Sequence, residues 1–465
     1  MAVEDKVSDE KCNEEGKDWP QIVAVLSGCL SPLSSGLLIA WTSPFLLKIT
    51  KDKENYDVTE DQGSYFALLS TVGICLLSPF VLSIPDTIGR KNTLLLTAIP
   101  HMATWVIKAL SRNLYAIYFA RFCVGFGDAL QFSSLPMYLG EITTPRVRGV
   151  WGNGMICSLF LGQFLINVIG AYFTVQETAL LCLTVPVVFL MTFSFMPESP
   201  YFYIMKKRDE EAKEALRRLR RVKDVEHEFD QLKSAVYRQM SESGTWTDLL
   251  KIRSNRRALI AAVFLRMAQL YSGLFAFAAF TQYIFEKSGG KVNSEISAMI
   301  YMGFAFVLFS SAAYFSNKLG RRNSFIISTS LASVLLTLEG VYFYIDRYQP
   351  EIDLEMFTWF PLVGMIIFVI VCSFGVVIIP TLMLGELFSV SVKAKGVCVV
   401  TTLFGLMTLF TNVLFYNINL YTGLCGPFFL FGVCTAVSAI LSYYLVPETK
   451  GKTLEDIQLT LKQLN

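Results

Sequence analysis

The sequence predicts an all-α integral membrane protein with twelve transmembrane helices, arranged as two six-helix halves joined by a cytoplasmic helical connector. Three observations predict this fold class: an apolar composition, twelve apolar stretches of spanning length, and junction motifs that occur twice. Hydrophobic residues make up 53% of the 465 residues and charged residues only 17%, whereas soluble domains carry about 25% charge. Because so little polar surface is available, most helices must face lipid or one another.

Apolar stretches long enough to span a membrane occur along the whole chain, since a bilayer core of about 30 Å needs about 20 such residues per helix. The predicted spans are 20–49, 64–85, 92–111, 113–140, 148–173, 177–196, 257–286, 295–317, 323–345, 356–388, 394–421 and 425–446. The predicted domains are an N-tail (1–19), an N-terminal half (20–200), a connector (201–256), a C-terminal half (257–446) and a C-tail (447–465).

The polar connector is expected to be helical. Its apolar residues keep helical spacing, at Ala212, Ala215, Leu216, Leu219 and Val222, and basic residues cover the other faces. Its place between membrane spans favours a helix that packs at the membrane surface over a nucleic-acid patch. In the C-tail, a capping box that begins at Thr453 predicts a second polar helix.

The basic residues determine the expected orientation. Placing both termini in the cytoplasm puts most of the 40 Lys and Arg, including the basic run of the connector, on the cytoplasmic side. The N-terminus is polar and lacks the pattern of a cleavable signal peptide. We therefore expect a multi-pass protein of the cell membrane with cytoplasmic termini.

Charged motifs at the cytoplasmic junctions occur once in each half, which indicates a tandem duplication. Opposite charges from these junctions are expected to meet when the cytoplasmic ends of the two halves come together, and so to form a cytoplasmic gate. The residues of this expected gate are Asp86, Arg90, Lys91, Glu141, Arg148, Glu198, Arg321, Arg322, Glu386, Lys393 and Glu448. The alternative is that these charges serve only as topogenic residues and helix caps.

Enzymatic and metal chemistry is not expected. The chain has two histidines, and nine of its ten cysteines lie in or beside apolar stretches without CxxC spacing, which is typical of small core residues. No nucleophile with a base and no phosphate loop is assembled in the sequence. We expect no catalytic residue, no metal, no cofactor and no nucleic-acid partner; the expected partners are a small-molecule substrate and the lipid bilayer.

The junction motifs together resemble the sugar porter family of the major facilitator superfamily. They are DTIGRKN (86–92), ARFCVGFGDAL (120–130), PMYLGEITTPRVRG (136–149), PESPYF (197–202), LGRRNSF (319–325), LGELFSVSVKAKG (384–396) and VPETKGKTLEDI (446–457). The string AWTSP (40–44) makes the chain most similar to insect trehalose and hexose facilitators. The resemblance implies two six-helix halves and alternating access, with a sugar as the default substrate.

The expected substrate positions depart from the family pattern. In the seventh span Gln269 and Ser272 are kept, but Ile156 and Ala305 stand where the family carries amides, and the tenth-span hinge retains Pro380 alone. Bends that line a cavity are expected at Pro136, Pro380 and the Ser272–Gly273 pair. The candidate substrate-binding residues are Gln269, Ser272, Asp128, Arg266, Thr381 and Thr408.

Ionisable residues inside spans are functional candidates by default. Arg121 follows the family pattern and is expected to be structural. Asp128 and Arg266 are atypical and lie on spans four and seven, which line the central cavity in the superfamily that the chain resembles. Two alternatives stay open for them: they bind a charged or strongly polar solute, or they pair with local backbone or water at the cavity edge. The first span contains no acid, which favours passive facilitation over proton coupling. The sequence therefore favours facilitated transport of a sugar as the function. The alternatives are a facilitator of another solute (a polyol or an organic anion) and a non-transporting sensor. The sequence does not indicate the oligomeric state.

Overall fold

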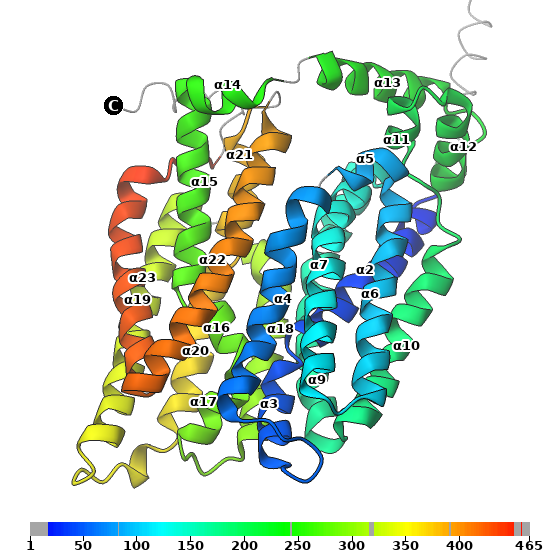
Figure 1. Cartoon of the computed structure of the whole chain (residues 1–465). Coiled ribbons are helices and arrows are strands. Elements are labelled where there is room, and N and C mark those ends of the chain that lie inside the picture. The colour runs from blue at the N-terminus through cyan, green and yellow to red at the C-terminus, as the bar shows by residue number, and fades with distance from the viewer. Residues whose placement is uncertain are drawn as a thin grey trace, which may run out of the picture.

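The computed structural model describes residues 17–81, 83–241, 244–315, 320–389, 392–450 and 457. Within these ranges the regular structure is helical and contains no strand (Figure 1). Ten helical stretches of the described chain are long and apolar enough to cross a membrane. The helices Leu114–Ile142 and Arg253–Tyr271, which are not among these ten, complete the twelve predicted spans. The predicted all-α integral membrane fold class is confirmed.

The N-terminal half contains six spans and two short helices. Its spans are α2 (Trp19–Ile39) with α3 (Thr42–Lys51), α4 (Glu60–Val81), α6 (Arg90–Leu110), α7 (Leu114–Ile142), α9 (Gly154–Tyr172) and α10 (Val175–Phe193), and its short helices are α5 (Ile84–Ile88) and α8 (Pro145–Trp151). The bundle buries an apolar core that includes Leu94, Leu135, Tyr138 and Phe193.

The C-terminal half repeats this order of spans. They are α15 (Arg253–Tyr271) with α16 (Leu274–Ala279) and α17 (Thr281–Lys287), α18 (Ser294–Phe315), α19 (Arg321–Tyr348), α20 (Phe360–Phe374) with α21 (Ile379–Leu387), α22 (Lys393–Thr422) and α23 (Cys425–Leu445). A single 3₁₀ turn, η2 (Glu355–Phe357), precedes α20.

The connector forms α11 (Pro200–Met205), α12 (Asp209–Arg220), α13 (Glu226–Ser241) and α14 (Trp246–Lys251), which lie at one end of the bundle (Figure 1). We name this the connector end, and the opposite end, with the 52–59 and 349–359 segments, the loop end. The predicted apolar face is buried at Ala212, Leu216 and Leu219, as the helical spacing requires. Val222 lies beyond the helix, because Arg221 adopts a left-handed conformation with φ 58°. The tail helix expected from Thr453 lies outside the described residues.

Three spans that were expected as single helices are interrupted. The first breaks between Ile39 and Thr42, the seventh at Gly273 and Phe280, and the tenth between Phe374 and Ile379. Gly273 has φ 79°, a conformation that glycine adopts without steric cost. The Ser272–Gly273 and Pro380 interruptions agree with the sequence prediction. α7 contains Pro136 without a break, so the bend expected there stays a prediction. The first spans of both halves are thus discontinuous, as in many transporters built from repeats.

The two halves pack side by side through α4 against α22 and α9 against α18, and at the loop end through α3 against α17 (Figure 1). Between α9 and α18, Phe160 and Phe309 meet edge to face with ring centroids 4.5 Å apart. Asn153 adds a hydrogen bond from its Nδ2 to the carbonyl of Ser310, at 2.9 Å. The two halves are therefore in contact along these helices, and the conformational state of the protein depends on which of its two ends is open.

Candidate functional site

At the connector end of the N-terminal half, a tight turn places Arg90 among acids. Gly89 has φ 101°, and a Cβ there would lie 2.2 Å from Oε2 of Glu198, so the turn requires glycine. The Arg90 guanidinium, almost fully buried, pairs through Nε with Glu141 at 3.0 Å and through Nη2 with Asp86 at 3.1 Å. Glu198 accepts the backbone N–H of Lys91 at 3.0 Å. The first turn of α6 is thereby joined to the ends of α7 and α10.

The C-terminal half repeats this geometry. Gly320 has φ 89°, Arg321 Nη2 lies 3.4 Å from Glu386 Oε1, and Glu448 accepts the backbone N–H groups of Arg321 at 2.9 Å and Arg322 at 3.1 Å. Burial alone raises the pKa of Glu448, but the backbone N–H donors that surround it hold its pKa below the ordinary carboxyl value. The repeated motifs therefore form the same interaction twice: a glutamate carboxylate caps the N-terminus of the third span in each half.

The matching hydroxyls complete each network. Ser199 donates to Glu141, and Thr449 donates to Glu386. These residues were not singled out from the sequence, although each one directly follows a motif glutamate. The repeat of the Pro-Glu-Ser and Pro-Glu-Thr strings was the signal that could have identified them.

In this structure the charged networks form within each half, and the pairing across the halves that is expected when the connector ends come together stays a prediction. The ion pairs that the structure shows for Arg90 and Arg321 each lie within one half, because each arginine opens a helix directly after a tight turn and reaches only the neighbouring helix ends. Of the other predicted gate residues, Lys91 donates through Nζ to the carbonyl of Ser194, while Arg148 and Lys393 are exposed. The networks thus brace each half, and their gating role stays a prediction.

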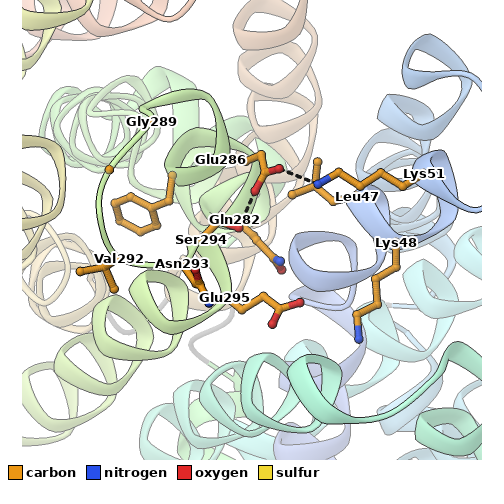
Figure 2. A pocket seen from close by; sticks show the side chains of 12 residues that line it. Leu47, Lys48, Lys51, Gln282, Glu286, Gly289, Val292, Asn293, Ser294 and Glu295 are labelled. Atoms are coloured by element: carbon orange, nitrogen blue, oxygen red, sulfur yellow. Dashed lines mark hydrogen bonds and ion pairs between the residues drawn. The ribbon is translucent and has the colours of Figure 1, made fainter. Parts of the chain in front are cut away.

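Besides the Asn153–Ser310 hydrogen bond, further polar contacts join the two halves at the loop end. Lys51 of α3 pairs with Glu286 of α17 at 2.5 Å (Figure 2), and the Tyr416 hydroxyl of α22 donates to Asp61 of α4. Both pairs join residues that come from opposite halves. None of the four residues was singled out in the sequence, since each is an ordinary charge or tyrosine in or near the end of a helix.

A buried chain of hydrogen bonds supports this closure. The Gln282 backbone N–H donates to Ser43 Oγ at 3.3 Å, Ser43 Oγ donates to Asn167 Oδ1 at 2.9 Å, and Asn167 Nδ2 donates to the Gln163 carbonyl at 2.8 Å. The chain crosses from α17 through α3 to α9. Ser43 belongs to the AWTSP string, so part of that motif fastens the two halves together.

Trp41 of the same motif marks the break in the first span. Arg121 donates to the carbonyls of Leu38 and Phe66, and the Lys108 ammonium lies 3.7 Å from the centre of the Trp41 ring. The Leu38 carbonyl is close to the end of α2, where helix carbonyls lose their partners. The structural role expected for Arg121 is therefore to hold this break.

A small apolar pocket lies at the centre of the interface, between α2, α9, α16 and α18. Its volume is about 40 Å³, and it is lined by Phe160, Gln163, Phe275, Tyr301 and Phe309, among others. Gln163 is 6% exposed, and its Oε1 has no hydrogen-bond partner among the described residues. Because a buried amide oxygen without a partner is costly, Gln163 is a candidate solute contact that the sequence analysis missed.

Most of the predicted substrate-binding groups bond to the protein itself. Gln269 accepts from Arg266 Nη1 at 2.8 Å and donates to the Val377 carbonyl at 3.0 Å. Ser272 and Thr408 donate to backbone carbonyls of their own helices, and Thr381 is exposed on α21. Val377 lies in the break of the tenth span, so Gln269 ties the seventh span to that break.

Asp128 and Arg266 belong to different environments. Asp128 is fully buried and accepts from Ser35 Oγ at 2.5 Å, with His101 Nε2 at 3.5 Å. These partners come from α2 and α6, inside the N-terminal half. Arg266 lies over the Phe404 ring, 5.1 Å from its centre, in the C-terminal half. The structure therefore places the two charges in different halves with local partners, which corrects their expected position at one shared cavity.

Known transporters resemble this chain in sequence over nearly its whole length. The sequence matches the family model "Sugar (and other) transporter" over residues 22–461. The chain belongs to this transporter family. It is 31% identical over 453 residues to the facilitated trehalose transporter Tret1 of Apis mellifera ligustica, covering 94% of this chain and 87% of the relative. The corresponding protein of Culex quinquefasciatus is 32% identical, covering 95% and 85%.

Solved structures of sugar transporters share the fold. The inward open conformation of the xylose transporter XylE from E. coli superposes with a TM-score of 0.77 at 16% identity, covering 95% of this chain and 99% of that one. A structure of the proton:xylose symporter XylE bound to 6-bromo-6-deoxy-D-glucose gives 0.74 at the same identity. The family is one of membrane transporters and not of enzymes, and the fold is that of the major facilitator superfamily.

Proposed function

We propose that this protein is a facilitative sugar transporter of the cell membrane that works by alternating access, with the connector end and both termini in the cytoplasm. One observation supports the mechanism most directly: the polar contacts between Lys51 and Glu286, Asp61 and Tyr416, and Ser43 and Gln282 close the loop end between the two halves. The charged networks of the connector end lie within the halves. This arrangement corresponds to a state closed to the outside.

Trehalose is the first substrate to test, because the relatives that cover most of the chain are named for its facilitated transport. Passive transport is favoured by the first span, which has no acidic residue between Gln21 and Thr50. Gln163, whose amide oxygen has no hydrogen-bond partner in the part of the chain that the structure describes, is the proposed contact for a sugar hydroxyl at the central pocket. The connector-end networks hold α6 and α19 in place while the halves rock as units.

Arg266 supports a second candidate, a facilitator of organic anions. Its partners in the described structure are the Gln269 amide and the Phe404 ring, which leave its charge without a carboxylate. A guanidinium at such a position suits a carboxylate substrate. The sugar proposal takes precedence because it also agrees with the family.

Counterflow in proteoliposomes tests both candidates. Vesicles loaded with one unlabelled solute are placed in trace labelled solute, from a panel of trehalose, hexoses, other disaccharides, polyols and organic anions. We expect labelled trehalose or a hexose to accumulate transiently, without acidification of the lumen and without sensitivity to an uncoupler. Accumulation of organic anions alone would replace the sugar proposal. Failure of every solute with folded protein would support a sensor.

Gln163→Leu provides the site-specific part of this test. It should raise the concentration of sugar that half-saturates transport by roughly 2- to 13-fold, the loss of one hydrogen bond of about 0.5 to 1.5 kcal/mol. Ser133→Ala, which removes a partly buried hydroxyl that donates to its own helix at Leu130, is the control and should leave transport unchanged. Equal half-saturating sugar concentrations for the two variants would contradict a contact between Gln163 and the transported sugar.

A further inference from the structure

A second, larger pocket opens at the loop end, where the two halves meet. Its volume is about 390 Å³, within the range of about 300 to 1,000 Å³ that small-molecule sites occupy. Lys48 and Lys51 of α3 line one side, and Gln282, Glu286 and Glu295 of α17 and α18 line the other (Figure 2). Because each half supplies one wall, the pocket is complete only while the loop ends of the halves are together.

Gln282 shows that the pocket is built to take a polar ligand. The residue is 4% exposed, and its side-chain amide has no hydrogen-bond partner among the described residues. Figure 2 shows this amide pointing into the space between the walls. Because this amide lines the pocket, a ligand that both donates and accepts hydrogen bonds can pair with it there.

The charges of the lining select the chemistry of that ligand. Two ammonium groups face two carboxylates, so the pocket has no excess of either sign. Glu286 already holds Lys51 at 2.5 Å and accepts from Ser294 Oγ at 2.7 Å, and Lys48 donates to the carbonyl of Phe173 at 3.1 Å. Glu295 shows no such partner in the described residues. An anion would meet the two carboxylates, whereas hydroxyl groups can donate to Glu295 and exchange bonds with Gln282.

We propose that this pocket is an outer binding site for a neutral sugar, separate from the central path and formed only while the outer gate is closed. The inference rests on the proposed function, since it takes the transported class of solute as its ligand. A sugar bound here contacts both halves and stabilises their closed outer ends. External sugar therefore opposes the return to the outward-open state, by linkage between binding and conformation.

Efflux from cells that express the protein tests the proposal. Cells loaded with labelled trehalose release it into medium with increasing unlabelled trehalose. Low external sugar should accelerate efflux through exchange at the central path, and high external sugar should slow it through the outer pocket. Gln282→Leu, which keeps the side-chain size, should move the slowing to at least fivefold higher external concentration and leave the acceleration in place. Glu351→Gln, an exposed carboxyl in the 349–359 segment, is the control.

Binding of labelled trehalose to the purified full chain gives an independent readout. Wild-type protein should bind two equivalents; Gln282→Leu should lower the affinity of one of the two sites at least fivefold, and Glu295→Gln should weaken the same site. The outer site is wrong if high external trehalose does not slow efflux through the wild-type protein. It is also wrong if efflux through Gln282→Leu slows at the same external concentration as wild type. If labelled trehalose does not leave the cells at all, the proposed transport has failed. Binding to the purified chain then decides the pocket alone, and identical binding curves for wild type and Gln282→Leu overturn it.

Discussion

Reversal of the Lys51–Glu286 pair is the most direct test of the conformational mechanism. The two side chains are 64% and 36% exposed and 2.5 Å apart, and exposed pairs contribute about 0 to 1 kcal/mol. Removing the attraction with Glu286→Gln should therefore shift the equilibrium away from the outer-closed state by at most about fivefold. Lys51→Glu also adds repulsion of similar size, so the shift should reach at most about 30-fold.

The distance between the connector ends of the halves reports this equilibrium. Spin labels on cysteines introduced at Thr87 of α5 and Lys251 of α14, in a background without the native cysteines, should give mainly a long distance in wild type. Lys51→Glu should enrich a shorter distance, and the exchange Lys51→Glu with Glu286→Lys should restore the long one. Lys291→Glu, an exposed charge beside the pocket, is the control. Unchanged distance distributions for Lys51→Glu, or no rescue by the exchange, would refute the role of this pair as an outer gate.

Three further predictions concern the connector end and the seventh span. Glu198→Gln should destabilise the purified protein by about 1 to 3 kcal/mol and more than Glu448→Gln, because Glu198 is the more buried cap; thermal unfolding in detergent measures this, and equal losses would contradict it. The folded pKa of Glu448 lies below its ordinary value of 4.5, so its contribution is fully present above pH 4.5 and declines as pH falls through the folded pKa. The difference in Tm between wild type and Glu448→Gln should shrink on acidification, and a difference that grows would overturn this sign. Gln269→Ala should lower both stability and transport, since it removes the bonds to Arg266 and to the break of the tenth span; a change in apparent affinity at unchanged Tm would instead return Gln269 to direct substrate contact.

The sequence alone determined where the spans lie along the chain, because this depends on local patterns, but not every break within them. A stretch of about 20 apolar residues is a span wherever it packs, and the apolar face of α12 follows from its spacing. The duplicated turns at Gly89 and Gly320 are also local, since each needs a left-handed residue directly before a basic helix start. Arg121 could be assigned a structural role because its motif was intact.

Only the tertiary structure decided which charges meet. Arg90 and Arg321 were recognised as gate candidates, but their partners depend on which helix ends lie within the reach of one side chain, and these proved to belong to the same half. Asp128 faces inward to His101 because of the rotation of α7 within its bundle, which apolar periodicity cannot define in a helix that is hydrophobic on all sides. Lys51 and Glu286 are 235 residues apart in sequence and carry no local signal. Contacts between the halves depend on the relative placement of two bundles, and that placement is a property of the folded state alone.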